Sequence, residues 1–228
     1  MAGPSTQLVM PFAPVVSYEP DDFIAGEASR AALAMVRAWP DWPYSIMLLH
    51  GPHGCGKTHL AHVFARAARA SFIAPGRLGQ QPADQLLTGG HSWILDGIEQ
   101  VKDQAALAQL INHARARGDY LLLTATKAAA QLSFTLPDLQ SRLRALPALE
   151  MGAPDDALLR SVLAKAFADR QLRIAPNILD YAVTHLERSY EAAAQFAEQM
   201  DRASLAQGRA VTLALVRRLL NQPPSEIE

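Results

Sequence analysis

Residues 51–58 read Gly51-Pro52-His53-Gly54-Cys55-Gly56-Lys57-Thr58, which is the pattern G-x-x-x-x-G-K-T. Glycines at these places let consecutive backbone N–H groups wrap around phosphate oxygens, because no Cβ stands in the way. Lys57 would reach the β- and γ-phosphates, Thr58 would ligate Mg²⁺, and the next helix would add its positive N-terminal end. The residues predicted to contact a nucleotide here are Pro52, His53, Gly54, Cys55, Gly56, Lys57, Thr58 and His59. A chance glycine-rich turn is the alternative.

The sequence on both sides of the loop has the strand and helix context that such a loop needs. Residues 45–49 form a short apolar run, as expected of a strand buried on both faces of a parallel sheet. After the loop, apolar residues from Leu60 to Ala68 recur at helical spacing. Further strand-like runs follow at 71–73, 92–95 and 120–124, separated by loops or by a helical pattern. This alternation predicts an α/β fold with a parallel, doubly wound sheet.

Asp96 follows the apolar run 92–95, where a Walker B motif places its Mg²⁺-side carboxylate. We predict that Asp96 is a catalytic residue and that Asp96 and Thr58 together bind the metal ion. The alternative is an Asp that only starts a turn, because many buried strands end in such a residue. The next residue, Gly97, stands where many ATPases carry a second acid that activates water, and Glu99 could substitute for it. The simpler hypothesis is slow intrinsic hydrolysis, with bound nucleotide acting mainly as a conformational ligand.

The pattern changes beyond Pro147, because four helical patterns follow and no strand-like run appears after Met151. Asp155, Pro176, Ser189 and Thr212 are placed to start these helices. We therefore predict a flexible tail at 1–16, a nucleotide-binding domain at 17–150 and a small helical lid at 151–228.

Composition limits the classes of protein that this chain can belong to. Half of its 228 residues are hydrophobic and 19% are charged, which excludes global disorder, and no apolar run is long enough for a membrane span. A net charge of −1 provides no basic excess for nucleic acid, so we expect no direct sequence-specific DNA binding. The single cysteine and the absence of a basic leader favour a cytoplasmic location and no membrane partner.

Together these motifs resemble the AAA+ ATPases of the bacterial initiator DnaA group, and within it the short regulatory members, over roughly residues 13–222. The resemblance implies a five-stranded parallel sheet, a small helical lid, and ADP or ATP with Mg²⁺ as the ligand. The segment 21–26 is similar to the family's lead-in, which would place Phe23 and Ile24 near the adenine. Core packing before a helix explains these two residues equally well.

Three further residues take candidate roles from the same resemblance. Thr126 lies where the family has its sensor-1 residue, although the family often has Asp there. Arg142, within the segment 136–143, is the candidate arginine finger and a catalytic residue, a fixed positive fork that neutralises charge on a phosphoryl group in a neighbouring subunit. Arg188 resembles the lid's sensor-2 residue. A solvated arginine is the alternative for Arg142, and an ion pair with Glu187 is the alternative for Arg188.

The tail contains a segment that resembles peptides bound by the DNA polymerase III sliding clamp. Its candidate partner-binding residues are Gln7, Leu8, Met10, Pro11 and Phe12. The chain ends soon after its last lid helix, so we expect no origin-binding domain. The resemblance implies a regulator that, with the DNA-loaded clamp, promotes hydrolysis of ATP bound to DnaA and prevents re-initiation. A DnaA-like adaptor or helicase loader without that activity is the alternative, and a homodimer stays open.

Overall fold

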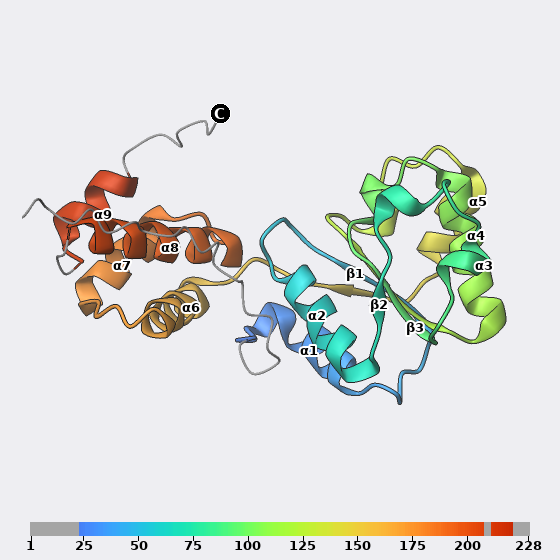
Figure 1. The fold of residues 1–228 in the computed structure, drawn as a ribbon, viewed down its shortest axis with the longest axis horizontal. Coiled ribbons are helices and arrows are strands. Elements are labelled where there is room, and N and C mark those ends of the chain that lie inside the picture. The colour runs from blue at the N-terminus through green and yellow to red at the C-terminus, as the bar shows by residue number, and fades with distance from the viewer. Residues whose placement is uncertain (1–22, 208–210, 221–228) are drawn as a thin grey trace, which may run out of the picture.

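A five-stranded parallel sheet lies at the centre of the N-terminal part of the chain (Figure 1). The structure is a computed structural model, and it describes residues 23–207 and 211–220. The strands, in the spatial order β2-β3-β4-β1-β5, are β1 (Ile46–His50), β2 (Ser71–Phe72), β3 (Ser92–Leu95), β4 (Tyr120–Ala125) and β5 (Ala148–Glu150). The predicted α/β class with a five-stranded parallel sheet is confirmed.

Helices cover both faces of the sheet, because successive strand residues point to opposite sides. Leu48 contributes to one apolar core and Leu49 to the other. Figure 1 shows α1 and α2 on one side, and α3, α4 and α5 on the other. These helices are α1 (Glu27–Arg37), α2 (Lys57–Ala68), α3 (Ala83–Leu86), α4 (Gln104–Arg117) and α5 (Pro137–Arg144). Within the described part of the chain, short 3₁₀ turns occur at η2 (Pro75–Arg77), η3 (Ile98–Gln100) and η4 (Ala129–Gln131).

The strand order brings the predicted motifs to one edge of the sheet. Strand β4 lies between β1 and β3 and is parallel to both. The phosphate loop follows β1, Asp96 follows β3, and the residues from Thr124 onward end β4. Since the carboxyl ends of parallel strands meet at the same edge, these three segments adjoin one another.

A group of four helices with its own apolar core follows the sheet (Figure 1). Each begins at a start signal expected from the sequence: Asp155 accepts a hydrogen bond from Leu158 N, Pro176 is the first residue of its helix, and Ser189 and Thr212 accept from Ala192 N and Leu215 N. The helices are α6 (Asp156–Asp169), α7 (Pro176–His185), α8 (Tyr190–Gln207) and α9 (Leu213–Leu220). The predicted helical lid is therefore present.

The segment between β5 and α6 crosses the start of the phosphate loop. Met151 N donates to His50 O at 2.7 Å, and Gly152 N donates to Ala28 O at 3.3 Å. A Cβ at Gly51 would lie 2.0 Å from the Met151 carbonyl oxygen. Only glycine fits at Gly51, so the first glycine of the motif is needed for the passage of this linker.

Among the strands of the described residues, β5 is the one that the apolar pattern did not locate. It has three residues, of which Ala148 and Glu150 are exposed, so it shows no continuous apolar run. Within residues 23–207 and 211–220, no helix has the length and apolar character of a membrane span.

Candidate nucleotide site

The phosphate loop joins β1 to α2 through two glycines with left-handed backbone. Gly54 has a φ of +68° and Gly56 a φ of +98°, values that other residue types rarely adopt. Pro52 and His53 are exposed, whereas Cys55 is fully buried beneath the loop. The turn directs the chain into α2, whose first residue is Lys57.

Lys57 extends back over the loop and contacts no carboxylate among the described residues. Its Nζ donates to the carbonyl oxygens of Gly51, at 2.7 Å, and Pro52, at 2.8 Å. Burial raises the pKa of the Cys55 thiol, and the adjacent Lys57 ammonium acts in the opposite direction. Lys57 Nζ also contacts Cys55 Sγ at 3.8 Å, so the hydrogen-bond partners of this ammonium group among the described residues are all uncharged. The loop therefore carries the positive charge that phosphate requires.

Thr58 and Asp96, the two predicted metal-side residues, are in direct contact. The Thr58 hydroxyl donates to Asp96 Oδ2 at 2.8 Å. The Thr124 hydroxyl donates to Asp96 Oδ1 and accepts from Gly97 N at 2.8 Å. Thr124 is fully buried and holds the carboxylate from the β4 side. Thr124 was not among the residues predicted from the sequence, although a threonine near the end of an apolar strand was a visible signal.

These groups fit a magnesium nucleotide. Mg²⁺ is usually held in proteins by one or two side-chain oxygens, with phosphates and water as the other ligands. Thr58 and Asp96 offer such a pair. In the part of the chain that the structure describes, no three His, Cys, Asp or Glu side chains gather as a metal site. The donor set therefore suits a cation that arrives with phosphates better than a metal bound by protein alone.

Glu99 lies at the end of β4, where its Oε1 accepts from Thr126 N at 3.0 Å. Thr126 thus contacts Glu99 through its backbone, while Thr124 contacts Asp96. Gly97 has a φ of +77°, and a Cβ there would lie 2.5 Å from Gln100 Nε2. The glycine in the second-acid position is consequently part of a tight turn that aims Glu99 at the end of β4.

An aromatic group flanks the loop on the side predicted to receive the base. Phe23 is buried against α1 and α2 and makes an edge contact with His59, with ring centroids 5.2 Å apart. A Cβ at Gly56 would lie 3.0 Å from the Phe23 ring. Ile24 adjoins this group, and its carbonyl oxygen accepts from the Tyr190 hydroxyl at 2.9 Å. Phe23 therefore packs in the core and also borders the loop.

Arg188, the lid residue predicted to face the nucleotide, pairs with Asp156 of α6. Its Nε lies 2.9 Å from Asp156 Oδ1, and the two side chains are 63% and 59% exposed. The lid residues that touch the loop are the next two along the chain, Ser189 and Tyr190. Neither residue was among the site residues predicted from the sequence.

Arg142 lies on α5, where two neighbours hold its guanidinium. Its Nε donates to Asp138 Oδ2 at 2.8 Å, and its Nη1 donates to Asn112 Oδ1. Among the described residues, Nη2 has no hydrogen-bond partner. Two neighbouring acceptors therefore fix the orientation of this side chain, which is 30% exposed.

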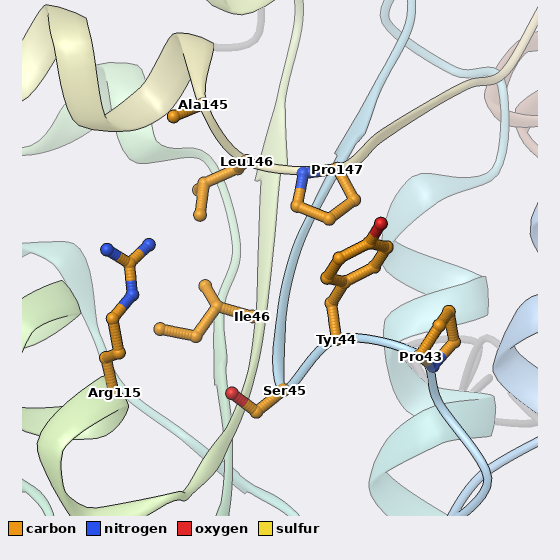
Figure 2. Close-up of a pocket in the computed structure, with 8 residues that line it drawn as sticks. All are labelled: Pro43, Tyr44, Ser45, Ile46, Arg115, Ala145, Leu146 and Pro147. Atoms are coloured by element: carbon orange, nitrogen blue, oxygen red, sulfur yellow. The ribbon is translucent and has the colours of Figure 1, made fainter.

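The candidate clamp-binding residues 7–12 lie outside the residues that the structure describes. A separate pocket of about 620 Å³ opens where β1 and β5 begin, at the opposite edge of the sheet from the phosphate loop (Figure 2). Figure 2 shows Arg115 extending toward Ala145 and Leu146, with Tyr44 beside Pro147. This pocket contains none of the predicted site residues.

Comparisons with known protein families match both parts of the chain. Residues 47–78 match the family described as ATPase family associated with various cellular activities (AAA), and residues 156–220 match the family described as Hda, lid domain. An uncharacterized protein of Haemophilus influenzae is 28% identical over 183 residues, which cover 75% of this chain and 79% of that protein.

Solved structures share the fold at low sequence identity. Domain III of the Thermotoga maritima replication initiation protein DnaA superposes with a TM-score of 0.77 at 16% identity, over 92% of this chain and 98% of that one. AMPPCP-bound DnaA from Aquifex aeolicus gives 0.70 at 17% identity, over 84% and 67%. The Thermotoga maritima RuvB Holliday junction branch migration motor gives 0.69 at 20% identity, over 87% and 69%. The chain therefore has the α/β fold of the AAA+ proteins with a helical lid, and that lid resembles the lid domain of Hda.

Proposed function

We propose that the chain is a nucleotide-bound regulator that, with the DNA-loaded sliding clamp, promotes hydrolysis of ATP bound to the initiator DnaA and so prevents re-initiation. The observation that carries this proposal is the match of residues 156–220 to the Hda lid family. DnaA-like folds alone would suit an initiator, a loader or a motor equally well. A lid of the Hda type favours the regulator.

The chain's own nucleotide, ADP or ATP with Mg²⁺, would occupy the loop. Lys57 would move from its two carbonyl partners to phosphate oxygens, and Thr58 and Asp96 would hold Mg²⁺, which neutralises phosphate charge. Thr124 would fix the orientation of Asp96. Gly97 provides no carboxylate next to Asp96, so we infer slow intrinsic turnover and a nucleotide that mainly sets the conformation.

Arg142 would act on the ATP of the partner. Asp138 and Asn112 hold its guanidinium through Nε and Nη1. Because the side chain is already ordered, it would lose less conformational entropy when it docks on the partner. The nitrogen Nη2 would approach the partner's phosphates first, and the Asp138 ion pair would then exchange for phosphate contacts. Because that ion pair is partly exposed, its loss is a small penalty beside a charge-assisted bond to phosphate.

The clamp would be engaged by the tail, through Gln7, Leu8, Met10, Pro11 and Phe12. A glutamine with spaced apolar anchors can enter a hydrophobic pocket in extended form, with few residues to order. Docking on a DNA-loaded clamp would raise the local concentration of the regulator near DnaA. The rate at which DnaA hydrolyses its ATP would then increase without new contacts to DnaA.

The test is a phosphate-release assay with ATP-bound DnaA, DNA-loaded clamp and this chain. We expect the chain to accelerate release, and a variant lacking residues 1–12 to lose clamp retention and most of the acceleration. The matched control replaces residues 1–12 by a Gly/Ser sequence of equal length. If the deletion leaves acceleration intact, the clamp-dependent role is wrong. If the full chain recruits a helicase to DnaA without accelerating release, the adaptor or loader alternative is correct.

A further inference from the structure

The first residues of α8 are seated directly on the phosphate loop. Tyr190 N donates to Gly54 O at 2.7 Å. A Cβ at Gly54 would lie 2.4 Å from the Cβ of Ser189, the capping residue of the same helix. The lid therefore contacts the loop through backbone, at a distance that only glycine permits.

The Tyr190 side chain ties the lid to a second segment of the nucleotide site. Its hydroxyl donates to Ile24 O at 2.9 Å, and its ring stacks on Phe23 with centroids 6.0 Å apart and planes inclined by 25°. A Cβ at Gly56 would lie 3.4 Å from the same ring. Burial raises the pKa of Tyr190 to about 12, so the phenol keeps the proton that it donates. One side chain thus joins the lid, the loop and the segment before α1.

Arg188 offers no comparable connection. Its guanidinium and the Asp156 carboxylate are both within the lid region and are each more than half exposed. Exposed ion pairs of this kind stabilise a fold little, and this one does not reach the loop. Of these two lid residues, Tyr190 is the one that bonds to the loop and to Ile24.

We propose that Tyr190 is a positioning residue that couples nucleotide occupancy to the seating of the lid and slows nucleotide release. In a phosphate cradle the N–H groups converge on the anion, so the outward-facing Gly54 carbonyl is free to accept from Tyr190 while phosphate is bound. Bound phosphate orders the loop and so fixes the position of the Gly54 carbonyl. The hydrogen bond from Tyr190 N to this carbonyl then holds the lid against the loop. By reciprocity, a held lid retains the nucleotide. The inference rests on the nucleotide-binding part of the proposed function.

The test measures release of a fluorescent ADP analogue from the full chain after a chase with excess ADP. We expect Tyr190→Ala, which removes the ring and the hydroxyl, to accelerate release more than about 10-fold. Tyr190→Phe keeps the ring and the backbone bond, so we expect an acceleration of about 2- to 10-fold. The matched control is Tyr181→Phe in α7, a lid tyrosine that stacks on His185, and it should release nucleotide at the wild-type rate.

Hydrogen exchange of the nucleotide-free protein provides a readout that does not depend on ligand. Tyr190→Ala should raise amide exchange in the loop 51–58 and at the start of α8, whereas Tyr190→Phe should leave the Tyr190–Gly54 bond protected. If Tyr190→Ala does not fold, the release rate of Tyr190→Phe decides alone.

Wild-type release rates in both Tyr190 variants would overturn the inference. It would also be overturned if Tyr190→Ala bound the analogue faster and more tightly, because the phenol would then obstruct the site. A Lys57→Ala variant separates this failure from that of the proposed function. If Lys57→Ala loses binding and the Tyr190 variants match wild type, only the coupling role is wrong. If the wild-type chain binds no nucleotide, the proposed function fails first.

Discussion

Replacing Thr124 by valine isolates the hydrogen bonds that hold Asp96. Valine has nearly the same shape, so the substitution removes one hydroxyl from a fully buried position and leaves no cavity. The Gly97 N–H then loses its acceptor, and Asp96 loses one of its two hydroxyl donors. An unsatisfied buried donor costs about 1–3 kcal/mol. For a chain of this length that corresponds to a fall in Tm of roughly 2–12 °C.

The same substitution should weaken magnesium binding through Asp96. Partners that orient a metal ligand typically contribute on the order of 10-fold or more to metal affinity. We therefore expect Thr124→Val to raise, by about that factor, the Mg²⁺ concentration at which ADP binding is half-maximally tightened. Nucleotide binding without Mg²⁺ should change little, because Lys57 and the loop are untouched. Titration of a fluorescent ADP analogue at several Mg²⁺ concentrations measures both quantities.

Thr126→Val is the matched control, since Thr126 lies two residues further on and contacts Glu99 only through its backbone N–H. It should keep the wild-type Mg²⁺ dependence. A double-mutant cycle with Asp96→Asn adds a second check, because the two substitutions should be strongly non-additive. The reasoning is refuted if Thr126→Val shifts the Mg²⁺ dependence and Thr124→Val does not.

Three further predictions concern the loop and the turn after β3. Gly54→Ala should lower the Tm and loosen the lid, because the new Cβ is strained at a φ of +68° and collides with Ser189. Adding Ser189→Gly should restore only the part of the Tm that the collision removes, and thermal melting measures both variants. Because burial raises the folded-state pKa of Cys55, stability should fall as pH rises above the unfolded thiol pKa of about 8.5. Denaturant melts from pH 7 to 10 should show less of this loss in Cys55→Ala, and equal curves would contradict the assignment. Gly97→Asp should speed intrinsic hydrolysis. Unchanged slow turnover in a variant that melts at the wild-type Tm, and so tolerates the substitution in this tight turn, would exclude the missing carboxylate as its cause.

The parts of the fold that local sequence encodes were predictable. The phosphate loop and the starts of the lid helices depend on residues within a few positions of one another, so a short pattern contains the information. Asp155 and Ser189 cap helices by accepting a hydrogen bond from the backbone N–H three residues ahead. Strands such as β3 are buried on both faces and therefore show continuous apolar runs.

The parts that escaped prediction depend on distant segments. Strand β5 is defined by its pairing with β1, and its three residues are too few to show an alternation of apolar and polar side chains. The distinction between Thr124 and Thr126 depends on the register of β4 with β3. Leu95 pairs with Leu123, which places Thr124 level with Asp96, whereas Thr126 lies beyond the end of β4. Arg188 resembles a family motif, but only the orientation of α8 on the loop shows that Tyr190, two residues further on, makes the contact.

The central claim is that Arg142 acts on ATP held by another protein, and a single-turnover measurement tests it directly. DnaA loaded with labelled ATP would be mixed with DNA-loaded clamp and wild-type chain, Arg142→Ala or Arg144→Ala. Arg144 lies on the same helix, is exposed and has no ion-pair partner among the described residues, so it controls for loss of charge. An arginine finger contributes on the order of 10³–10⁵ in rate. The account predicts that Arg142→Ala abolishes the acceleration while Arg144→Ala keeps it, and equal stimulation by the wild-type chain and Arg142→Ala would contradict it.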